Sequence, residues 1–250
     1  MKVIDISRYN GAITWSKAAK QIDGVIIRAG YRGYGSGKLV IDSSFKKNIA
    51  GASAAGVPIG VYFVTQAVTT EEAKEEARYT MELVKGYKLS LPIFIDSEDG
   101  NKGAGRADRG KLSKFNRTAI LKTFCEEIQR GGYVAGVYAS QSWFKDYLDI
   151  SMLYSCFFLW VARYSSSKPT IPYNAWQYTD AGVIDGIKGY VDISNFLTDK
   201  TTQKSNEEIA DEVLAGKWGN GEARKKALTA AGYNYRAVQD IVNRKIKERG

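Results

Sequence analysis

The sequence predicts an α/β protein: an irregular TIM-like β/α barrel followed by a small C-terminal three-helix module. Short apolar runs alternate with amphipathic helical patterns along residues 1–198, acids stand where several runs end, and the composition changes after residue 198. Alternating strands and helices are typical of a parallel sheet covered by helices. An open doubly wound sheet would give the same pattern and stays an alternative.

Eight apolar runs, each five to seven residues long, are the predicted strands. Their length and their bounding turn residues indicate buried strands. They lie at residues 2–6, 24–29, 58–64, 91–96, 133–139, 157–162, 175–179 and 189–194. The glycine-containing segment "GYRGYGSGK" at 30–38 lacks the spacing of a phosphate-binding loop, so we expect it to rim a cleft.

About five helices are predicted between these strands. One follows Asp42, with apolar residues on a single face through residue 52. A second begins at the capping box formed by Thr69 and Glu72, and a third begins at Ser113 and ends at Gly131. Shorter candidates lie at 15–21 and 141–148.

The C-terminal fifth of the chain has a different composition. Residues 199–205 are polar, without apolar periodicity, and are predicted to be a linker. Residues 206–250 contain three short helical patterns, which begin near Asn206, Glu222 and Asn234. A unit of this size has a hydrophobic core that is only just adequate.

Composition limits the chemistry that the chain can perform. The 250 residues include no histidine, which excludes Ser–His and Cys–His nucleophile pairs and histidine-ligated zinc. General acid and base work would fall to Asp, Glu, Tyr or Lys. Cys125 and Cys156 both stand beside apolar residues, so we expect two core thiols.

The formal net charge of +9 favours anionic partners. The basic residues are spread along the chain without a nucleic-acid-binding motif, so no nucleic-acid partner is expected. No run approaches the roughly 20 apolar residues of a membrane helix, so no membrane insertion is expected. The N-terminal "MKVIDISRYN" has no signal-peptide hydrophobic region.

Four carboxylates are expected at one barrel mouth. Asp5 lies near the end of the first strand, Asp96 and Glu98 end the fourth, and Asp192 lies in the eighth, which closure makes the neighbour of the first. Residues i and i+2 of a strand point to the same face, about 6.6 Å apart. Close carboxylates in a partly desolvated crevice have separated pKa values, as glycoside hydrolysis requires. A divalent-metal site or an ordinary charged loop would use the same residues.

The stretches "DISRYNG" at 5–11, "GVYFVTQAVTTEEAKEEA" at 60–77, "FIDSEDG" at 94–100, "AWQYT" at 175–179 and "GYVDIS" at 189–194 resemble glycoside hydrolase family 25. The members of this family are lysozymes (N-acetylmuramidases) of phages and Gram-positive bacteria. The resemblance covers essentially residues 1–198. Residues 207–246, with "GKWGNGEARKKALTAAGY", resemble a cell-wall-binding repeat found in some phage lysozymes.

The resemblance implies a role for each acid. Glu98 is expected to be the general acid, and Asp96 to stabilise positive charge or orient the substrate's N-acetyl group. Asp5 and Asp192 complete the catalytic set. We also ask whether Asp99, beside the pair, raises the pKa of Glu98.

Sugar sites combine aromatic faces with a few polar groups, although aromatic residues in strands are more often core. The matching motifs place the following residues at the expected substrate cleft: Tyr62, Gln66, Trp160, Gln177 and Tyr178. In the C-terminal unit, Trp218 and Arg224 are candidate wall contacts, with a core role for Trp218 as the alternative.

The resemblance implies a phage endolysin that cleaves the β-1,4 bond between N-acetylmuramic acid and N-acetylglucosamine in Gram-positive peptidoglycan. Residues 1–198 would be the catalytic barrel and 206–250 the wall-binding module. No metal and no cofactor are implied. We expect synthesis in the host cytoplasm and action on the wall after release. The alternatives are a wall lectin on an inactive barrel, a metal-dependent hydrolase and a bacterial autolysin; oligomeric state is not predicted.

Overall fold

The computed structural model describes residues 1–100, 103–154, 156–197, 204, 206–231 and 233–249. Within them, eight strands form a closed barrel in the order β1-β9-β8-β7-β6-β5-β4-β2, and pairing of β2 with β1 closes it. The barrel strands are β1 (Lys2–Ile6), β2 (Gly24–Arg32), β4 (Ile59–Val64), β5 (Ile93–Asp96), β6 (Ala135–Ser140), β7 (Phe158–Ala162), β8 (Ala175–Gly182) and β9 (Val191–Phe196). All eight correspond to predicted runs, so the barrel is confirmed and the open sheet is excluded.

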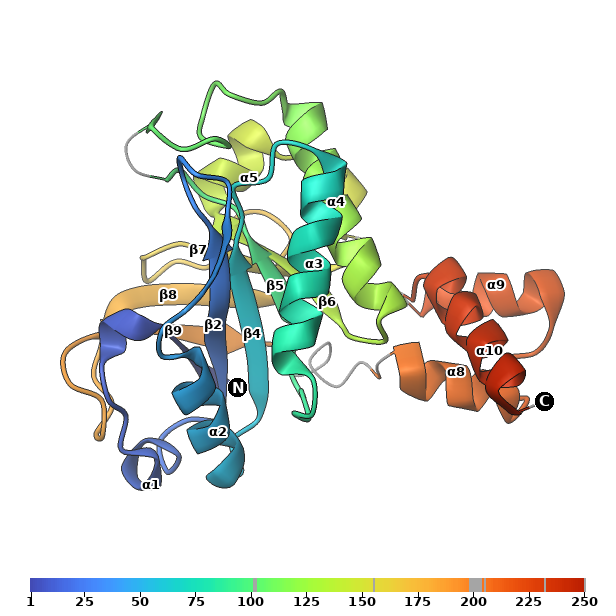
Figure 1. Cartoon of the computed structure of the whole chain (residues 1–250), viewed down its shortest axis with the longest axis horizontal. Coiled ribbons are helices and arrows are strands. Elements are labelled where there is room, and N and C mark those ends of the chain that lie inside the picture. The colour runs from blue at the N-terminus through green and yellow to red at the C-terminus, as the bar shows by residue number, and fades with distance from the viewer. Residues whose placement is uncertain (101–102, 155, 198–203, 205, 232, 250) are drawn as a thin grey trace.

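Two features make the barrel irregular. The last strand, β9, runs antiparallel to both of its neighbours, whereas the other barrel pairs are parallel. A ninth strand, β3 (Leu39–Ile41), pairs antiparallel with the end of β2 and stands outside the ring. The glycine-containing segment at 30–38 is therefore the end of β2 and the tip of a hairpin, which rises above the barrel in Figure 1.

The helices lie around the barrel and at the C-terminus (Figure 1). Those of the barrel region are α1 (Trp15–Ala18), α2 (Phe45–Ala54), α3 (Thr70–Val84), α4 (Lys114–Arg130), α5 (Gln141–Tyr147) and α6 (Ser151–Tyr154), with a short 3-10 turn, η1 (Arg8–Asn10). Thr69 and Ser113 cap α3 and α4 as predicted, since their side chains accept hydrogen bonds from the backbone N–H groups of Glu72 and Asn116.

The alternation of residues along each strand divides the core into two layers. One set of side chains packs between the barrel and its helices. The other fills the barrel interior: Val3, Ile26, Leu91, Phe94, Phe158, Trp160, Ala175 and Phe196. Gly136 makes room for this filling, because a Cβ there would lie 2.4 Å from the ring of Phe94. Two residues further along β1, β5 and β8, the same inward face carries Asp5, Asp96 and Gln177.

The C-terminal helices are α8 (Asn206–Leu214), α9 (Gly221–Ala230) and α10 (Tyr235–Arg249), and they have a hydrophobic cluster of their own. They meet the barrel at the end of α4, where the Asn206 side-chain amide donates to the carbonyl of Gln129 at 3.1 Å. Apart from Lys204, the predicted linker at 199–205 lies outside the described residues. The three-helix prediction is confirmed, and the predicted domain boundaries stay predictions.

Candidate active site

A pocket of about 190 Å³ opens where the barrel's parallel strands end. It contains all four predicted acids: Asp5, Asp96, Glu98 and Asp192. Its other lining residues are Tyr62, Tyr138, Trp160, Tyr164 and Gln177. The acids converge because Asp5 and Asp96 lie on the inward face near the ends of β1 and β5, and because β9 places Asp192 opposite Asp5 in the ladder.

A hydrogen-bonded chain fixes the orientation of Asp5. The Gln177 amide nitrogen donates to Asp5 Oδ2 at 2.8 Å, and the amide oxygen accepts from the hydroxyls of Tyr138 at 2.8 Å and Tyr164 at 3.1 Å. Burial and the charge of Asp192 raise the pKa of Asp5 well above its usual value, against the hydrogen bond from Gln177. Asp5 is therefore a rigidly held carboxyl that binds its proton tightly.

Asp96 ends β5 inside the barrel and is 4% exposed. Its Oδ1 atom has no hydrogen-bond partner among the described residues. Burial raises the pKa of Asp96 well above its usual value, and the charges of Glu98 and Asp5 act in the same direction. A buried acceptor without a donor is costly, so a ligand group with an N–H or O–H would find a vacant acceptor here.

Glu98 is the most accessible of the four acids, because its side chain is exposed at the pocket. Its pKa is nevertheless raised, first because the surrounding walls exclude water and then because Asp192 is close. Its exposure and its raised pKa are consistent with a side chain that faces a narrow concavity rather than bulk solvent. Glu98 is thus both reachable by a ligand and inclined to keep its proton.

Asp192 is half-buried, and burial together with the charge of Asp180 raises its pKa to about 6. Burial and neighbouring carboxylates raise the pKa of every acid in the pocket, so these groups hold their protons more tightly than exposed carboxyls do. Carboxyl groups whose environments differ in this way are suited to divided acid and base roles.

Asp99 does not act as the sequence suggested. It pairs with the Arg109 guanidinium and accepts from the Arg109 backbone N–H at 2.9 Å, contacts that lower its pKa. The raised pKa of Glu98 comes from burial and Asp192 instead. The hypothesis that Asp99 raises the pKa of the acid is therefore wrong, and Asp99 instead fixes the loop after β5.

The residue between the two acids anchors the strand end. Ser97 points away from the pocket, and its hydroxyl accepts from the Trp143 indole nitrogen at 3.0 Å. The Arg117 guanidinium covers the other face of this arrangement, 4.8 Å from the Trp143 ring centre. Ser97 directly follows β5, and Trp143 and Arg117 come from α5 and α4, so contacts with two helices hold the segment of Asp96 and Glu98 in place.

The predicted substrate contacts divide into two groups. Tyr62, Trp160 and Gln177 line the pocket. Trp160 is only 1% exposed and donates its indole N–H to Ser194 at 2.9 Å, so it forms part of the wall rather than a stacking platform.

Gln66 and Tyr178 do not line the pocket. Gln66 is fully buried, and its amide oxygen accepts from the backbone N–H of Ala107, which holds the loop after β5. Tyr178 lies on the face of β8 opposite Gln177 and packs against the outer core. Neither residue lies in the acid pocket, because Gln66 follows β4 in a loop and Tyr178 is on the outer face of β8, and their contact with substrate stays a prediction.

Two lining residues, Tyr138 and Tyr164, were missed. Tyr138 lies on β6 directly opposite Asp96 in the parallel ladder. It stands two residues after Gly136, so alternation along the predicted strand places both residues on the same face. Tyr164 follows β7 in a loop and is 54% exposed, so no periodicity marks it. Its role depends on a contact with Gln177 on the neighbouring strand β8.

In the C-terminal helices, Trp218 packs against the hydrophobic cluster and its indole N–H donates to Glu212 at 3.0 Å. Arg224 donates to Gln239 at 3.1 Å and to Asn220 at 2.9 Å. Both residues have internal contacts that support the fold of the helices, and the core alternative for Trp218 agrees with this packing.

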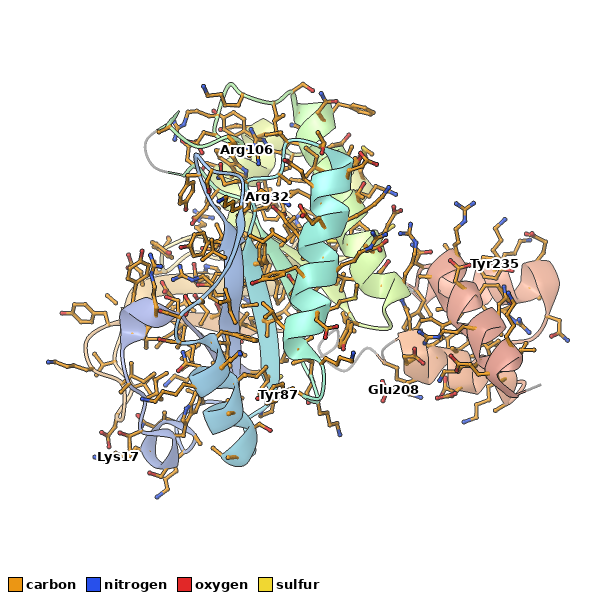
Figure 2. The ribbon with its side chains drawn as sticks, in the orientation of Figure 1. Lys17, Arg32, Tyr87, Arg106, Glu208 and Tyr235 are labelled. Atoms are coloured by element: carbon orange, nitrogen blue, oxygen red, sulfur yellow. The ribbon has the colours of Figure 1, made fainter. Side chains whose placement is uncertain are left out.

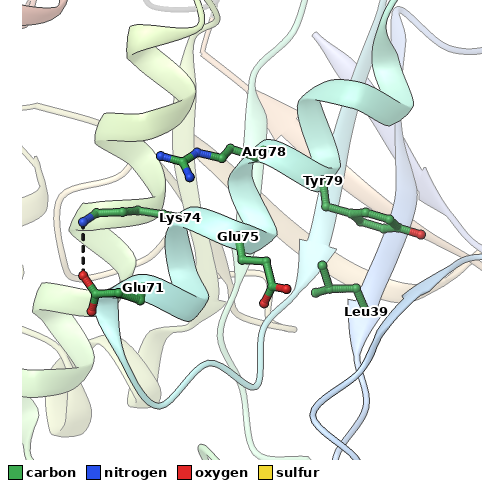
Figure 3. Close-up of a pocket in the computed structure, with 6 residues that line it drawn as sticks. All are labelled: Leu39, Glu71, Lys74, Glu75, Arg78 and Tyr79. Carbon is green, nitrogen blue, oxygen red and sulfur yellow. Dashed lines mark hydrogen bonds and ion pairs between the residues drawn. The ribbon is translucent and has the colours of Figure 1, made fainter.

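A second concavity, of about 600 Å³, lies between β3 and α3 (Figure 3). Its charged residues have partners: Lys74 pairs with Glu71 at 3.2 Å, and Glu75 pairs with Arg32 at 2.7 Å. Arg32 and Arg106, labelled in Figure 2, both bind Glu72 and so connect the hairpin, α3 and the loop after β5. This concavity offers no cluster of perturbed acids.

Within the residues that the structure describes, no group of three or more Asp, Glu, Cys or His side chains is arranged to hold a metal ion. In the same residues, no helix is long and apolar enough to cross a lipid bilayer.

Comparisons with known proteins agree on one family. Residues 4–187 match glycosyl hydrolases family 25, and residues 207–246 match the CW_7 repeat. The "Lysozyme" of Streptococcus phage Cp-7 is 31% identical over 199 residues, which are 74% of this chain and 55% of that protein. The chain thus spans about half the length of this relative.

Solved structures show the same fold. The modular autolysin LytC of Streptococcus pneumoniae, in complex with a synthetic peptidoglycan ligand, has a TM-score of 0.67 and 31% identity, covering 77% of this chain and 46% of that one. The catalytic domain of endolysin ply40 from bacteriophage P40 of Listeria monocytogenes has a TM-score of 0.68 and 26% identity, covering 81% and 96%.

Proposed function

The chain belongs to glycosyl hydrolases family 25, and from this premise we propose that it is a lysozyme that hydrolyses peptidoglycan. The bond cleaved is the β-1,4 bond between N-acetylmuramic acid and N-acetylglucosamine in Gram-positive walls. The observation that carries the proposal is the convergence of Asp5, Asp96, Glu98 and Asp192 in one pocket at the barrel mouth. No cofactor or metal takes part.

Glu98 is the general acid. An acid that protonates a leaving oxygen must be reachable by the substrate and must hold its proton near the working pH. Glu98 meets both conditions, because it is exposed at the pocket and its pKa is raised. Asp192 contributes by raising that pKa through its charge. The proton passes from Glu98 to the glycosidic oxygen as the bond to the anomeric carbon breaks.

Asp96 stabilises the positive charge that develops on the sugar ring or orients the N-acetyl group of the substrate. Its unpartnered Oδ1 supports this assignment, since an N-acetyl N–H would complete its hydrogen bonding. Donation to this oxygen, or a nearby developing positive charge, favours the ionised carboxylate and so offsets the burial that raises the pKa of Asp96.

Asp5 positions the polar wall of the pocket. Its hydrogen bond from Gln177 fixes the orientation of the amide, and the hydroxyl groups of Tyr138 and Tyr164 both donate to the Gln177 amide oxygen. Tyr62 and Trp160 complete the apolar part of the wall. Preorganised groups of this kind keep the substrate in a reactive geometry.

Residues 206–250 form the wall-binding module, and 1–198 form the catalytic barrel. The CW_7 match supports this division, as does the separate hydrophobic cluster of α8, α9 and α10. Trp218 and Arg224 shape the wall-contacting surface while serving the internal packing described above. The net charge of +9 favours approach to an anionic wall, most strongly at low salt.

The biological role is that of a phage endolysin, made in the host cytoplasm and active on the wall after release. Among similar proteins, one is a phage lysozyme and another is described as an autolysin, so an autolytic role has the same chemistry and is the alternative. Detecting the protein in phage-infected or uninfected cells separates the two.

Digestion of purified Gram-positive walls tests the chemistry. We expect new reducing ends at muramic acid, no newly freed amino groups, and the same rate with and without EDTA. Reducing ends at glucosamine would mean that the protein cleaves the other glycosidic bond of the glycan strand. Loss of activity in EDTA would favour the metal-dependent hydrolase. A protein that binds walls without releasing reducing ends would be a lectin.

A further inference from the structure

An exposed cation stands at the edge of the barrel mouth, outside the acid pocket. Arg8 follows β1 in the short turn η1, three residues after Asp5. Its guanidinium lies 4.9 Å from the ring centre of Tyr9 and 5.6 Å from that of Tyr31, and it donates to the Tyr9 hydroxyl at 3.0 Å. Aromatic faces hold a guanidinium in place without neutralising its charge.

The turn that carries Arg8 is itself well fixed. Ser7 and Asn10 form a reciprocal capping box, and the Arg8 backbone N–H donates to Asp42 Oδ2 at 3.2 Å. A long side chain normally loses considerable freedom when it binds a ligand. Here the backbone and the two tyrosines have already restricted it, so Arg8 is preorganised.

The two arginines at this edge differ in their partners. Arg28, which lies on β2, donates to Asp42 at 2.7 Å, and this ion pair matches its charge. In the described part of the chain, no carboxylate forms an ion pair with Arg8, whose side chain is exposed. Arg8 is therefore a held cation that is available to an external anion.

Tyr9 connects this cation to the acid pocket. Its ring is 76% exposed and lies under the Arg28 guanidinium, 5.0 Å from the ring centre. Arg28 in turn is close enough to Asp96 to act on the charge of that carboxyl. An anionic group of a bound glycan would be repelled from the acids, whereas Arg8 attracts it to this side of the mouth.

We propose that Arg8, held between Tyr9 and Tyr31, is a subsite for an anionic oxygen group of the wall polymer, with Tyr9 packing against the adjoining sugar. The group is a carboxylate of the lactyl-peptide branch of the glycan strand. This inference rests on the proposed function, because it specifies which part of peptidoglycan the mouth recognises beside the cleaved bond. A phosphate of an attached wall polymer presents the same chemistry, and the test separates the two sources.

The experiment measures release of reducing ends from soluble peptidoglycan strands over a range of concentrations. Four proteins are compared: the parent, Arg8→Gln, Arg8→Lys and Lys88→Gln. Lys88 is exposed in the loop before β5, at the opposite end of the barrel, so its variant has the same loss of charge away from the mouth. Each protein is assayed on untreated strands, on strands stripped of phosphate with hydrofluoric acid, and on stripped strands whose carboxyl groups have been amidated.

We expect Arg8→Gln to raise KM about two- to fivefold on untreated and stripped strands, with kcat unchanged, as for an exposed charge contact. Arg8→Lys should recover part of the loss, and Lys88→Gln should behave as the parent does. On amidated strands, Arg8→Gln and the parent should have equal KM. High salt should shrink the difference on charged strands.

A difference that disappears on stripping alone would assign the subsite to phosphate instead of carboxylate. The proposal is overturned if Arg8→Gln equals the parent on untreated strands, if its deficit persists on amidated strands, or if Lys88→Gln loses as much. Failure of the proposed function is distinguishable, because in that case the parent itself releases no reducing ends.

Discussion

The barrel mouth and the concavity between β3 and α3 are both lined by charged residues, but they distribute their charges differently. At the β3–α3 concavity, acids and bases alternate and pair, as Glu71 does with Lys74. At the mouth, four acids share one pocket, and the nearby Arg28 is already paired with Asp42. Hydrogen bonds from Thr70 and Lys74 lower the pKa of Glu71, whereas burial and crowding raise the pKa values of the acids at the mouth, and a retained proton is what an acid catalyst needs.

The largest effect should come from the mouth. Glu98→Gln removes the proposed proton donor while preserving shape, so we expect kcat to fall by about 10²- to 10⁴-fold. The measurement is release of reducing ends from purified walls, with circular dichroism to confirm folding. Glu75→Gln, in the second concavity, is the matched control and should retain the parent rate. A Glu98→Gln protein as active as the parent would remove Glu98 from its assigned role.

The second prediction concerns the stability that the buried ion pair between Arg32 and Glu76 contributes. Arg32 binds Glu76, which is fully buried and whose pKa burial raises to about 7 from 4.5. A raised folded-state pKa means that the contribution of Glu76 to stability is fully present below pH 4.5 and is lost as the pH rises through about 7. Arg32→Met leaves the charge unpaired and should lower the free energy of unfolding by about 3–5 kcal/mol at pH 8.

At pH 5 the loss from Arg32→Met should be smaller, because Glu76 can take up a proton. Urea unfolding of parent and variant at the two pH values measures the difference. An equal loss at both values would mean that Arg32 stabilises the hairpin through its contacts with Gly37 and Glu72 rather than through its charge.

A smaller effect, a gain rather than a loss of stability, is expected for a substitution of Asp192 in the mouth. Burial and Asp180 raise the pKa of Asp192 from 3.8 to about 6, so its contribution to stability is present below pH 3.8 and lost as the pH rises through about 6. Asp192→Asn removes this penalty and should stabilise the protein by about 1–2 kcal/mol at pH 7.5, after allowance for solvent screening.

Thermal unfolding of Asp192→Asn measures this gain, and the parent and variant should have similar Tm values at pH 3.5. We expect the stabilised variant to be a poorer enzyme, since Asp192 helps to keep the proton on Glu98. A variant that is less stable than the parent at pH 7.5 would show that Asp192 is held by favourable contacts rather than crowded.

The smallest effect should come from an exposed pair of the second concavity. Lys74→Gln removes an ion pair with Glu71 whose members are both exposed to solvent. Exposed pairs of this type contribute little, so Tm should change by no more than about 1 °C and activity should not change. A marked loss of activity would mean that this concavity takes part in the reaction, and would contradict the assignment of the reaction to the barrel mouth alone.

The sequence was sufficient to predict the barrel and the four acids, because both follow from local patterns. Apolar runs of the right length mark strands, and the i, i+2 spacing of Asp96 and Glu98 predicted a shared face; β5 ends at Asp96, yet both acids line the same pocket. The strand β3 was missed because three residues carry too little periodicity. The direction of β9 was also missed, since alternation along a strand is the same in both directions.

Contacts between distant segments could not be predicted in this way. The Trp143–Ser97 hydrogen bond joins residues 46 positions apart, and the Gln177–Asp5 bond joins residues 172 apart. Gln66 has the right residue type for a sugar contact but is occupied by the backbone of Ala107. The pairing of Asp99 with Arg109 likewise depends on how the following loop folds back.

The reversed direction of β9 determines the end of the barrel from which the chain continues toward the C-terminal helices. Because β9 runs opposite to β1, it ends at Phe196 beside Met1, at the end of the barrel away from the mouth. The same end carries the contact between Asn206 and Gln129. Phe196 lies four residues beyond Asp192 on β9, so about 14 Å of strand separates this end of the barrel from the acid pocket. In the proposed function, the C-terminal helices would therefore bind the wall polymer at a site separate from the bond that the acid pocket cleaves.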